Sequence, residues 1–302
     1  MEEWKMKLYE RLGREGFLIE ESMAKHTTFK TGGNADVFLM PKNTEELIDC
    51  IQILREWNIP YLIMGNGSNL LVGDGGIRGA VIQLCRRMQE IRLDGTNMYI
   101  QSGALLTAAA ATAADAGLAG LAFASGIPGT FGGAVVMNAG AYGGEMKDVL
   151  LCVEVLTKDL HISVIPAEAL ELSYRHSVVL EREYIVLGGT IRLKPGNAAQ
   201  IRADMERLAQ QRREKQPLQY PSAGSTFKRP EGYFAGKLIS DAGLKGKTIG
   251  GAQVSKKHAG FLINTGNATT RDILDLIAYC QTAVQEQFGV RLETEVKIVG
   301  EL

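Results

Sequence analysis

Two glycine-rich segments constrain this chain more than any other feature of its sequence. Of 302 residues, 35 are glycine, roughly 12% against an average of about 7%. Six glycines lie in GNGSNLLVGDGGIRG (65–79), directly after the apolar run YLIM, and seven lie in GIPGTFGGAVVMNAGAYGG (126–144). Glycine lets backbone N–H groups turn inward and approach a phosphate closely. Tight turns explain most single glycine loops, but two such loops, both poor in charge, shift the balance toward a nucleotide-type ligand and leave both interpretations open.

The standard nucleotide-binding motifs are absent from the sequence. Leu70 stands where G-x-G-x-x-G needs its third glycine. Gly246-Lys247-Thr248 resembles the end of a Walker A motif, but Asp241 stands where its first glycine should be. The sequence therefore argues against a Rossmann or P-loop site. A diphosphate held by backbone amides in another fold remains open.

Charge and cysteine usage exclude several other classes. Lys plus Arg number 33 and Asp plus Glu 34, a net charge of −1, which argues against a strongly basic nucleic-acid binder. The four cysteines and four histidines are scattered without metal-ligand spacing, so we expect no metal site and reduced cysteines. The charged N-terminus has no apolar signal core, and the stretch 103–128 is too poor in large apolar residues to span a membrane. We expect a soluble, cytoplasmic protein.

Periodicity and capping signals predict an α+β chain in two lobes. We expect a helix within 1–20 that ends near Gly13 or Gly16, and further helices at 43–59, 105–116, 197–215, 234–241 and 269–288. We expect strands at 35–40, 61–64, 80–84, 152–157, 161–165, 184–193, 260–263 and 290–299, with a hairpin at 90–103. Pro217 and Pro221 follow the charged helix, and a domain boundary is expected near 195–220. It separates a larger, glycine-rich N-terminal lobe from a smaller α/β C-terminal lobe.

Six motifs in this order closely resemble those of the UDP-N-acetylenolpyruvoylglucosamine reductase family (UDP-N-acetylmuramate dehydrogenases). They are FKTGG (29–33), GNGSNLL (65–71), SGIPGTFGGAVVMNAGAYG (125–143), SYRHS (173–177), AGSTFKRP (223–230) and LETEV (292–296). The likeness runs from about residue 24 to the end of the chain. Six ordered motifs are far more specific than any one alone.

The resemblance implies an FAD-binding domain of the PCMH/vanillyl-alcohol-oxidase type followed by a substrate-binding domain. After an N-terminal helix (1–24), the FAD-binding domain would span 25–195, with subdomains of about 25–85 and 86–195. The C-terminal substrate-binding domain would span 196–302. FAD and NADPH would be the cofactors, and a UDP-sugar the substrate. We expect a monomer.

In this family the 65–71 loop would wrap the FAD diphosphate, and the 125–143 segment would line the flavin. The residues implied to bind the cofactor are Thr31, Gly65, Asn66, Gly67, Ser68, Asn69, Leu70, Gly126, Ile127, Pro128, Gly129, Gly132, Gly133, Asn138, Ala139 and Gly140.

Three residues carry the implied catalytic roles. Arg175 would neutralise the substrate carboxylate, where a planar guanidinium suits bidentate contact. Ser225 would be the proton donor on the opposite side from the flavin, and Glu295 would lie near the carboxylate. Lys228 is a candidate to stabilise the alkoxide of Ser225 and to bind substrate, and Tyr174 would contact the nucleotide.

Each of these residues also has a structural interpretation. Arg175 could form a surface salt bridge, Ser225 could sit in a turn or cap a helix, and Glu295 could lie on a solvated strand face. Glu293 shares that face by the two-residue period, so only the motif alignment favours Glu295. We expect His176, His258 and a basic patch of Lys245, Lys247, Lys256 and Lys257 to be structural or solvated.

Two departures from the family pattern stand out. Arg229 follows the lysine of the serine motif, where some relatives carry Asn. The short stretch between Arg175 and Ser225 resembles the family's shorter type, without the tyrosine-bearing loop. Two other functions stay open at this point. A flavin oxidase or dehydrogenase for a small alcohol would need no Arg175, Ser225 and Glu295 set, and a flavin-binding or nucleotide-sensing protein would turn nothing over.

Overall fold

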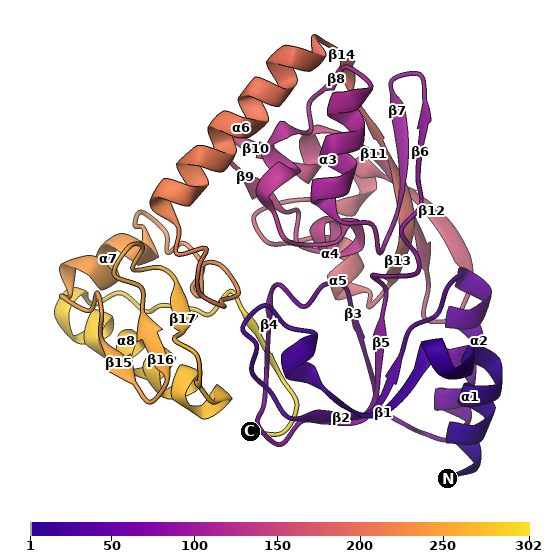
Figure 1. The fold of residues 1–302 in the computed structure, drawn as a ribbon, viewed down its shortest axis with the longest axis horizontal. Helices are drawn as coiled ribbons and strands as arrows, with labels where there is room; N and C mark the ends of the chain where they lie inside the picture. The colour runs from indigo at the N-terminus through magenta and orange to yellow at the C-terminus, as the bar shows by residue number, and fades with distance from the viewer. Residues whose placement is uncertain (1) are drawn as a thin grey trace. The chain divides into compact units, whose positions relative to one another are not determined.

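The computed structural model describes residues 2–302, which form two compact units (Figure 1). The first unit holds the chain up to Leu18, Phe38–Asn66 and Val81–Arg212; the second holds Ile19–Val37, Gly67–Ala80 and Arg213–Leu302. Both contain helices and strands, which confirms the predicted α+β class. The chain passes from the first unit to the second for the last time after Arg212.

A five-stranded antiparallel sheet organises the first unit. Its order is β12-β11-β13-β7-β6, from strands β6 (Ile91–Asp94), β7 (Asn97–Gln101), β11 (Leu150–Leu156), β12 (Ile162–Pro166) and β13 (Ile185–Arg192). Gly189 in central β13 pairs with Ile100 on one side and Val153 on the other. A Cβ at Gly189 would lie 3.1 Å from the Phe131 ring. Glycine at this position therefore lets the second glycine-rich segment pack directly on the sheet.

Two helices share a core with this sheet: α3 (Leu106–Asp115) and α4 (Phe131–Val136). Phe131 is fully buried among the alanines of α3 and the valines of β11. Thr130 caps α4 by accepting a hydrogen bond from the Gly133 amide at 3.4 Å. The core thereby fixes the segment 126–136 against a rigid sheet.

The remaining elements of the first unit are short or peripheral. Helices α1 (Glu3–Gly16) and α2 (Thr44–Glu56) pack together, and Asn43 caps α2 through the Glu46 amide at 2.8 Å, as predicted. The others are α5 (Val178–Glu181), α6 (Ala198–Lys215), β8 (Leu118–Ala119), β9 (Gly140–Ala141), β10 (Gly144–Glu145), β14 (Lys194–Pro195) and the 3-10 turns η2 (Ala122–Gly126), η3 (Met146–Asp148) and η4 (Ala167–Leu170).

A four-stranded sheet has the order β1-β2-β5-β3. Its strands are β1 (Phe17–Ser22), β2 (Asn34–Leu39), β3 (Tyr61–Met64) and β5 (Ile77–Gln83). The chain passes from one unit to the other within β1, β2 and β5. Strand β3 leads directly into the first glycine-rich segment, as the sequence predicted.

The second unit contains α8 packed on a small sheet. Helix α8 (Thr270–Phe288) covers β15 (Thr248–Ile249), β16 (Ala252–Val254) and β17 (Leu262–Asn264), with α7 (Ala235–Asp241) alongside (Figure 1). The unit also holds η1 (Met23–Lys25), β4 (Leu70–Val72) and β18 (Lys297–Val299). Asp74, from the first glycine-rich segment, accepts hydrogen bonds from the Thr270 and Arg271 amides at 2.8 and 2.9 Å. That segment is thus fastened to the start of α8.

The structure differs from the sequence predictions in several details, and strand β1, which directly follows α1, and helix α5 were not predicted. The final strand was expected over 290–299, but only Lys297–Val299 forms one, parallel to β4. Strand β4 and helix α4, both inside glycine-rich segments, were not predicted as elements. Glycine weakens local propensity for strand and helix, and here packing supplies what propensity does not.

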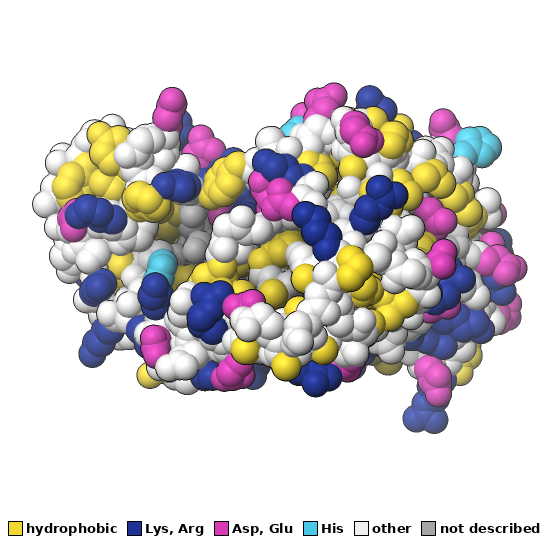
Figure 2. Space-filling view, turned by 90° about the horizontal axis from the view of Figure 1, so that it is seen from above, with side chains coloured by type: hydrophobic (Ala, Val, Ile, Leu, Met, Phe, Trp, Pro, Cys, Tyr) yellow, Lys and Arg dark blue, Asp and Glu magenta, His cyan; other side chains and the backbone are white. Residues whose placement is uncertain are grey.

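Within residues 2–302, none of the helices combines the length and apolarity needed to cross a membrane. On the face in Figure 2, lysine and arginine side chains are interspersed with aspartate and glutamate. This distribution agrees with the net charge of −1.

Candidate active site

In the first unit, the start of the first glycine-rich segment lies against the second. The Asn66 side-chain amide donates to the Pro128 carbonyl at 2.7 Å. A Cβ at Gly65 would lie 2.3 Å from Thr130 Oγ1, so only glycine allows this approach. The backbone of Gly65–Asn66 and the IPGT stretch therefore form one continuous surface from two segments that the sequence had linked only by their composition.

In the second unit, the rest of the first segment packs against FKTGG. The Thr28 amide donates to the Gly67 carbonyl at 3.2 Å, and the Gly33 amide to the Gly73 carbonyl at 2.9 Å. Gly73 itself is required by packing, because a Cβ there would overlap the Glu301 carbonyl. Gly65 and Gly73 therefore both allow close packing, the first against Thr130 and the second against the Glu301 backbone.

Within residues 2–302, three buried side-chain oxygen atoms near these loops have no hydrogen-bond partner: Thr28 Oγ1, Thr31 Oγ1 and Gln83 Oε1. Thr31 Oγ1 belongs to a side chain that is 3% exposed, and Gln83 Oε1 to one that is 4% exposed. The Gln83 Nε2 atom donates to the Gly65 carbonyl at 3.2 Å, so its free oxygen lies next to the first glycine loop. Leaving a buried polar atom unpaired is costly. Taken separately, each atom is an unpaired acceptor that a bound polar ligand such as FAD would satisfy, and Thr31 was predicted to bind FAD.

Several glycines predicted to contact the cofactor are also needed for packing within the first unit. A Cβ at Gly132 would overlap Ser102 Oγ, one at Gly126 would lie 2.7 Å from Arg212 Nη1, and one at Gly140 would lie 2.8 Å from Glu145 Cβ. Burial lowers the pKa of Arg212. Arg212 and Gln83 are candidate site residues that sequence reasoning missed, since neither belongs to a recognisable motif.

The other predicted cofactor residues take these positions. Ser68 and Asn69 are half-buried ahead of β4, which Leu70 begins, and Ile127 and Ala139 pack on the first unit's core. Gly129 accepts a hydrogen bond from the Leu106 amide through its carbonyl, and Gly133 lies in α4.

The side chain of Asn138, predicted to bind the cofactor, is hydrogen-bonded to protein groups in this structure. It is 1% exposed, and its amide binds Glu145, Ser173 and the backbone of Lys147.

Arg175 occupies a tight turn in the first unit. Ser173 and His176 exchange backbone hydrogen bonds at 3.3 and 3.2 Å, which closes a two-residue turn. Arg175 has φ 55°, a left-handed conformation uncommon for a residue with a side chain. Its guanidinium lies 5.1 Å from the centre of the Tyr174 ring, which is 52% exposed. The exposed Tyr174 and the half-buried Arg175 thus form a cation–aromatic pair at the tip of the turn.

Ser225 and Glu295 are held by neighbouring backbones in the second unit. The Glu295 amide donates to the Thr226 carbonyl at 2.8 Å, and Phe227 pairs with Thr294 in an isolated bridge. Both side chains are half-buried. The Asn69 side chain donates to the Glu295 carbonyl at 3.2 Å. The structure thus brings together Ser225, Glu295 and the end of the first glycine loop.

Lys228 forms an ion pair with Glu293, with 3.1 Å between Nζ and Oε2. Both side chains are largely exposed, at 44% and 67%, so the pair contributes little to stability and either partner can be exchanged. Glu293 is thereby distinguished from the half-buried Glu295. The Arg229 guanidinium lies 3.9 Å from the centre of the Phe234 ring.

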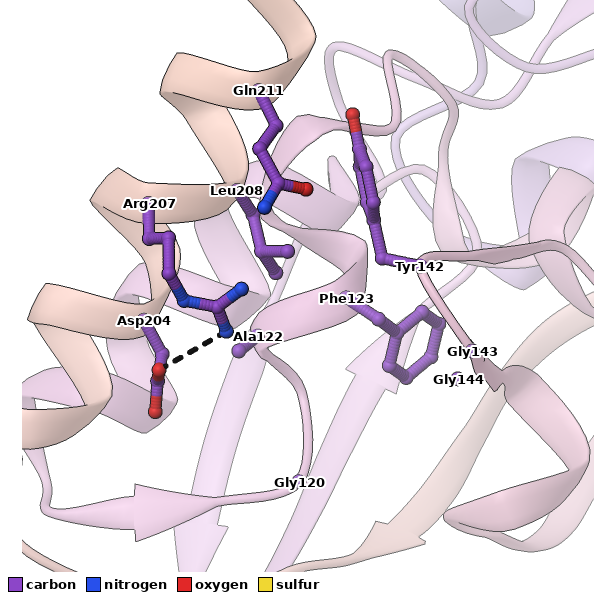
Figure 3. A pocket seen from close by; sticks show the side chains of 10 residues that line it. All are labelled: Gly120, Ala122, Phe123, Tyr142, Gly143, Gly144, Asp204, Arg207, Leu208 and Gln211. Carbon is purple, nitrogen blue, oxygen red and sulfur yellow. Dashed lines mark hydrogen bonds and ion pairs between the residues drawn. The ribbon is translucent and has the colours of Figure 1, made fainter.

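A separate cavity of about 460 Å³ lies in the first unit, between α6 and the loops around residues 120–123 and 142–144 (Figure 3). Asp204 and Arg207 of α6 form an ion pair of 3.2 Å across its wall. Phe123 and Tyr142 line the opposite side. None of the predicted catalytic residues lines this cavity. Across residues 2–302, no three His, Cys, Asp or Glu side chains cluster as a metal site would require.

Comparison with known proteins decides the family. The profile for the C-terminal domain of UDP-N-acetylenolpyruvoylglucosamine reductase matches residues 216–299, and a profile for an FAD binding domain matches 35–163. The reductase of Caldanaerobacter subterraneus subsp. tengcongensis is 54% identical over 295 residues, 98% of this chain and 97% of the relative. That of Clostridium perfringens is 49% identical over 299 residues, 98% of each.

The chain belongs to the UDP-N-acetylenolpyruvoylglucosamine reductase family. The crystal structure of the Thermus caldophilus reductase superposes with a TM-score of 0.79 at 36% identity, over 93% of this chain and 97% of that one. A variant of Phl p 4, a glucose oxidase, reaches a TM-score of 0.50 at 14% identity over 64% of this chain and 44% of that one, which shows a shared fold alone. The FAD-binding fold expected from the resemblance is confirmed.

Proposed function

We propose that this chain catalyses the NADPH-dependent reduction of UDP-N-acetyl-3-O-(1-carboxyvinyl)glucosamine to UDP-N-acetylmuramate in peptidoglycan precursor synthesis. The observation that carries the proposal is its 54% identity to a reductase of that name over 98% of the chain. FAD, when bound, accepts a hydride from NADPH and delivers one to the vinyl carbon of the enolpyruvyl ether.

The first and second glycine-rich segments would hold FAD. Backbone amides of Gly65–Asn69 suit the diphosphate, because glycine lets N–H groups converge on an anion. The unpartnered oxygens of Thr31 and Gln83 would complete their hydrogen bonding on the cofactor's polar groups. The fixed position of Pro128 on Asn66 preorganises this surface.

Arg175 would bind the substrate carboxylate. Hydride addition to the vinyl group pushes negative charge onto that carboxylate, so a cation there stabilises the transition state more than the ground state. A guanidinium can donate two parallel hydrogen bonds to a carboxylate. The strained turn at Arg175 is consistent with such a role, since strained backbone persists where its surroundings hold it.

Ser225 would supply the proton that completes the lactyl group. A serine hydroxyl is a poor acid by itself, so it needs neighbours that stabilise the alkoxide. Glu295, on the adjoining backbone, would orient groups around the carboxylate. Tyr174 would contact the nucleotide, and Lys228 could do so by exchanging its exposed partner Glu293.

NADPH and nucleotide sugars are small molecules of the cytoplasm. We therefore propose that the protein acts in the cytoplasm on a free UDP-sugar, without nucleic acid or membrane insertion. We further propose that it acts as a monomer.

The test is NADPH oxidation by the purified, FAD-containing protein with and without the enolpyruvyl UDP-sugar. The proposal predicts oxidation that depends on this substrate, with one UDP-N-acetylmuramate formed per NADPH. Oxidation of NADPH at the same rate without substrate, or a colourless protein that cannot be reconstituted with FAD, would contradict it. Turnover of a small alcohol instead would favour the flavin oxidase alternative.

A further inference from the structure

The turn that carries Arg175 needs external support. Arg175 has φ 55° in the second position of a two-residue turn, where glycine or asparagine is usual. The bonds between Ser173 and His176 are 3.2 and 3.3 Å long and close the turn, but they do not favour arginine at its tip. Such a conformation persists only when the surrounding structure holds it.

Asn138 supplies support on one side of the turn. Its Nδ2 atom donates to the Ser173 carbonyl at 3.2 Å and to Glu145 Oε2 at 2.7 Å. Its Oδ1 atom accepts from the Lys147 amide at 3.0 Å. The side chain is 1% exposed, and both of its amide hydrogens and its oxygen have protein partners. The hydrogen-bonding groups of the Asn138 side chain therefore connect the Arg175 turn to the segment that follows α4.

Ser177 supplies support on the other side. Its Oγ atom donates to the Val136 carbonyl at 2.8 Å, and the side chain is fully buried. Val136 is the last residue of α4. Val136 and Asn138 thus hydrogen-bond to Ser177 and Ser173, which lie on either side of Arg175. Helix α4 itself packs on β13, the central strand of the sheet.

We propose that Asn138 and Ser177 are positioning residues that hold Arg175 in its active conformation, and that Asn138 acts through the turn rather than by contact with FAD. The inference rests on the proposed role of Arg175 toward the substrate carboxylate. Its consequence is that removing either side chain weakens the use of substrate in the same way as a partial loss of Arg175.

The test is a double-mutant cycle on kcat/KM for the enolpyruvyl substrate. Asn138→Ala and Ser177→Ala are made in the wild type and in Arg175→Ala. Each single change is expected to lower kcat/KM by about 5- to 150-fold, mainly through KM, with FAD content unchanged. In Arg175→Ala the same changes should have little further effect, because the group that they position is already absent.

Asn264 provides a matched control. It is 3% exposed, donates to the Phe29 carbonyl and accepts from the Gly266 and Ala268 amides. Asn264→Ala also removes a buried amide, but its effect should be the same in both backgrounds. If Asn138→Ala folds poorly, Ser177→Ala still tests the inference, because alanine is nearly isosteric with serine.

If Asn138→Ala and Ser177→Ala lower kcat/KM by the same factor in the wild type and in Arg175→Ala, the inference is wrong, while the proposed role of Arg175 is unaffected. Loss of FAD from Asn138→Ala at unchanged KM would also overturn it, and would return Asn138 to the cofactor site. Wild-type kcat/KM in Arg175→Ala would overturn the proposed role of Arg175 and this inference with it.

Discussion

The backbone amide of Glu295 donates a 2.8 Å hydrogen bond to the carbonyl of Thr226. This bond joins the last motif of the chain to the serine motif some seventy residues earlier, so Ser225 and Glu295 are fixed by one backbone pairing. Glu293, two residues away, is instead drawn to Lys228 at the exposed rim. The structure separates two glutamates that sequence alternation alone could not distinguish.

Glu295→Ala should therefore lower kcat/KM strongly, by about 10²-fold or more, whereas Glu293→Ala should change it less than about threefold. Glu293 is the matched control because it lies on the same segment but pairs with an exposed lysine. Steady-state kinetics of both variants would check this. Equal losses in the two variants would contradict the assignment of Glu295.

Arg175→Lys should raise KM for the enolpyruvyl substrate, because lysine keeps the charge but cannot donate in parallel to both carboxylate oxygens. Charge-assisted hydrogen bonds contribute about 1.5–3 kcal/mol, so kcat/KM should fall about 10- to 150-fold. Arg182→Lys, seven residues later at the exposed end of α5, is the control and should behave as wild type. An unchanged KM in Arg175→Lys would argue against carboxylate binding.

Gly65→Ala should weaken FAD binding. Its methyl group would lie 2.3 Å from Thr130 Oγ1, which forces the first glycine loop away from residues 128–130 at a cost of about 1–3 kcal/mol. Retention of flavin absorbance through gel filtration measures the effect. Adding Thr130→Ala removes the clashing atom and should restore part of the binding. Full FAD retention in Gly65→Ala would mean that this approach does not shape the cofactor site.

His258 should make the second unit less stable as pH falls. Burial lowers its pKa in the folded state, with a smaller contribution from Lys245, and Nδ1 accepts from the Gly260 amide at 3.2 Å. Below the unfolded pKa of about 6.5, the unfolded chain binds a proton that the folded chain does not. Stability from this group is therefore present above that pH and lost as pH falls.

Thermal unfolding midpoints of the wild type and His258→Gln, measured from about pH 8 to about pH 5, would test this dependence. The wild type should lose more of its stability on acidification than the variant. Parallel pH profiles would show that His258 does not carry the effect.

Local signals in the sequence predicted most elements. The run YLIM matches β3 residue for residue, and α8 begins one residue after its capping Thr269, because both depend on neighbouring residues alone. Helix α4 escaped prediction because FGGAVV has two glycines, and its stability comes from packing on Gly189 of β13. The alternation at 290–299 suggested one strand, yet residues before Lys297 pair irregularly with the serine motif.

From the sequence, site residues could be predicted only where they belong to a recognisable motif. Motif order identified Arg175, Ser225 and Glu295 as candidates but gave no geometry. The contact of Asn66 with Pro128 joins residues 62 positions apart, which composition cannot reveal. Asn138 lies in a motif predicted to bind the cofactor, yet its side chain donates to the Ser173 carbonyl at the start of the Arg175 turn. Gln83 and Arg212 belong to no motif, so they become candidate site residues only through their contacts with Gly65 and Gly126 in the folded structure.

The proton-donor role of Ser225 is tested most directly by a single turnover in the absence of oxygen. The protein is reduced with one equivalent of NADPH and then mixed with the enolpyruvyl UDP-sugar. The wild type should reoxidise and form one equivalent of UDP-N-acetylmuramate. Ser225→Ala should be reduced at the normal rate but form product about 10²–10⁴-fold more slowly, while the neighbouring Ser222→Ala behaves as wild type. Product formation by Ser225→Ala at the wild-type rate would contradict the account.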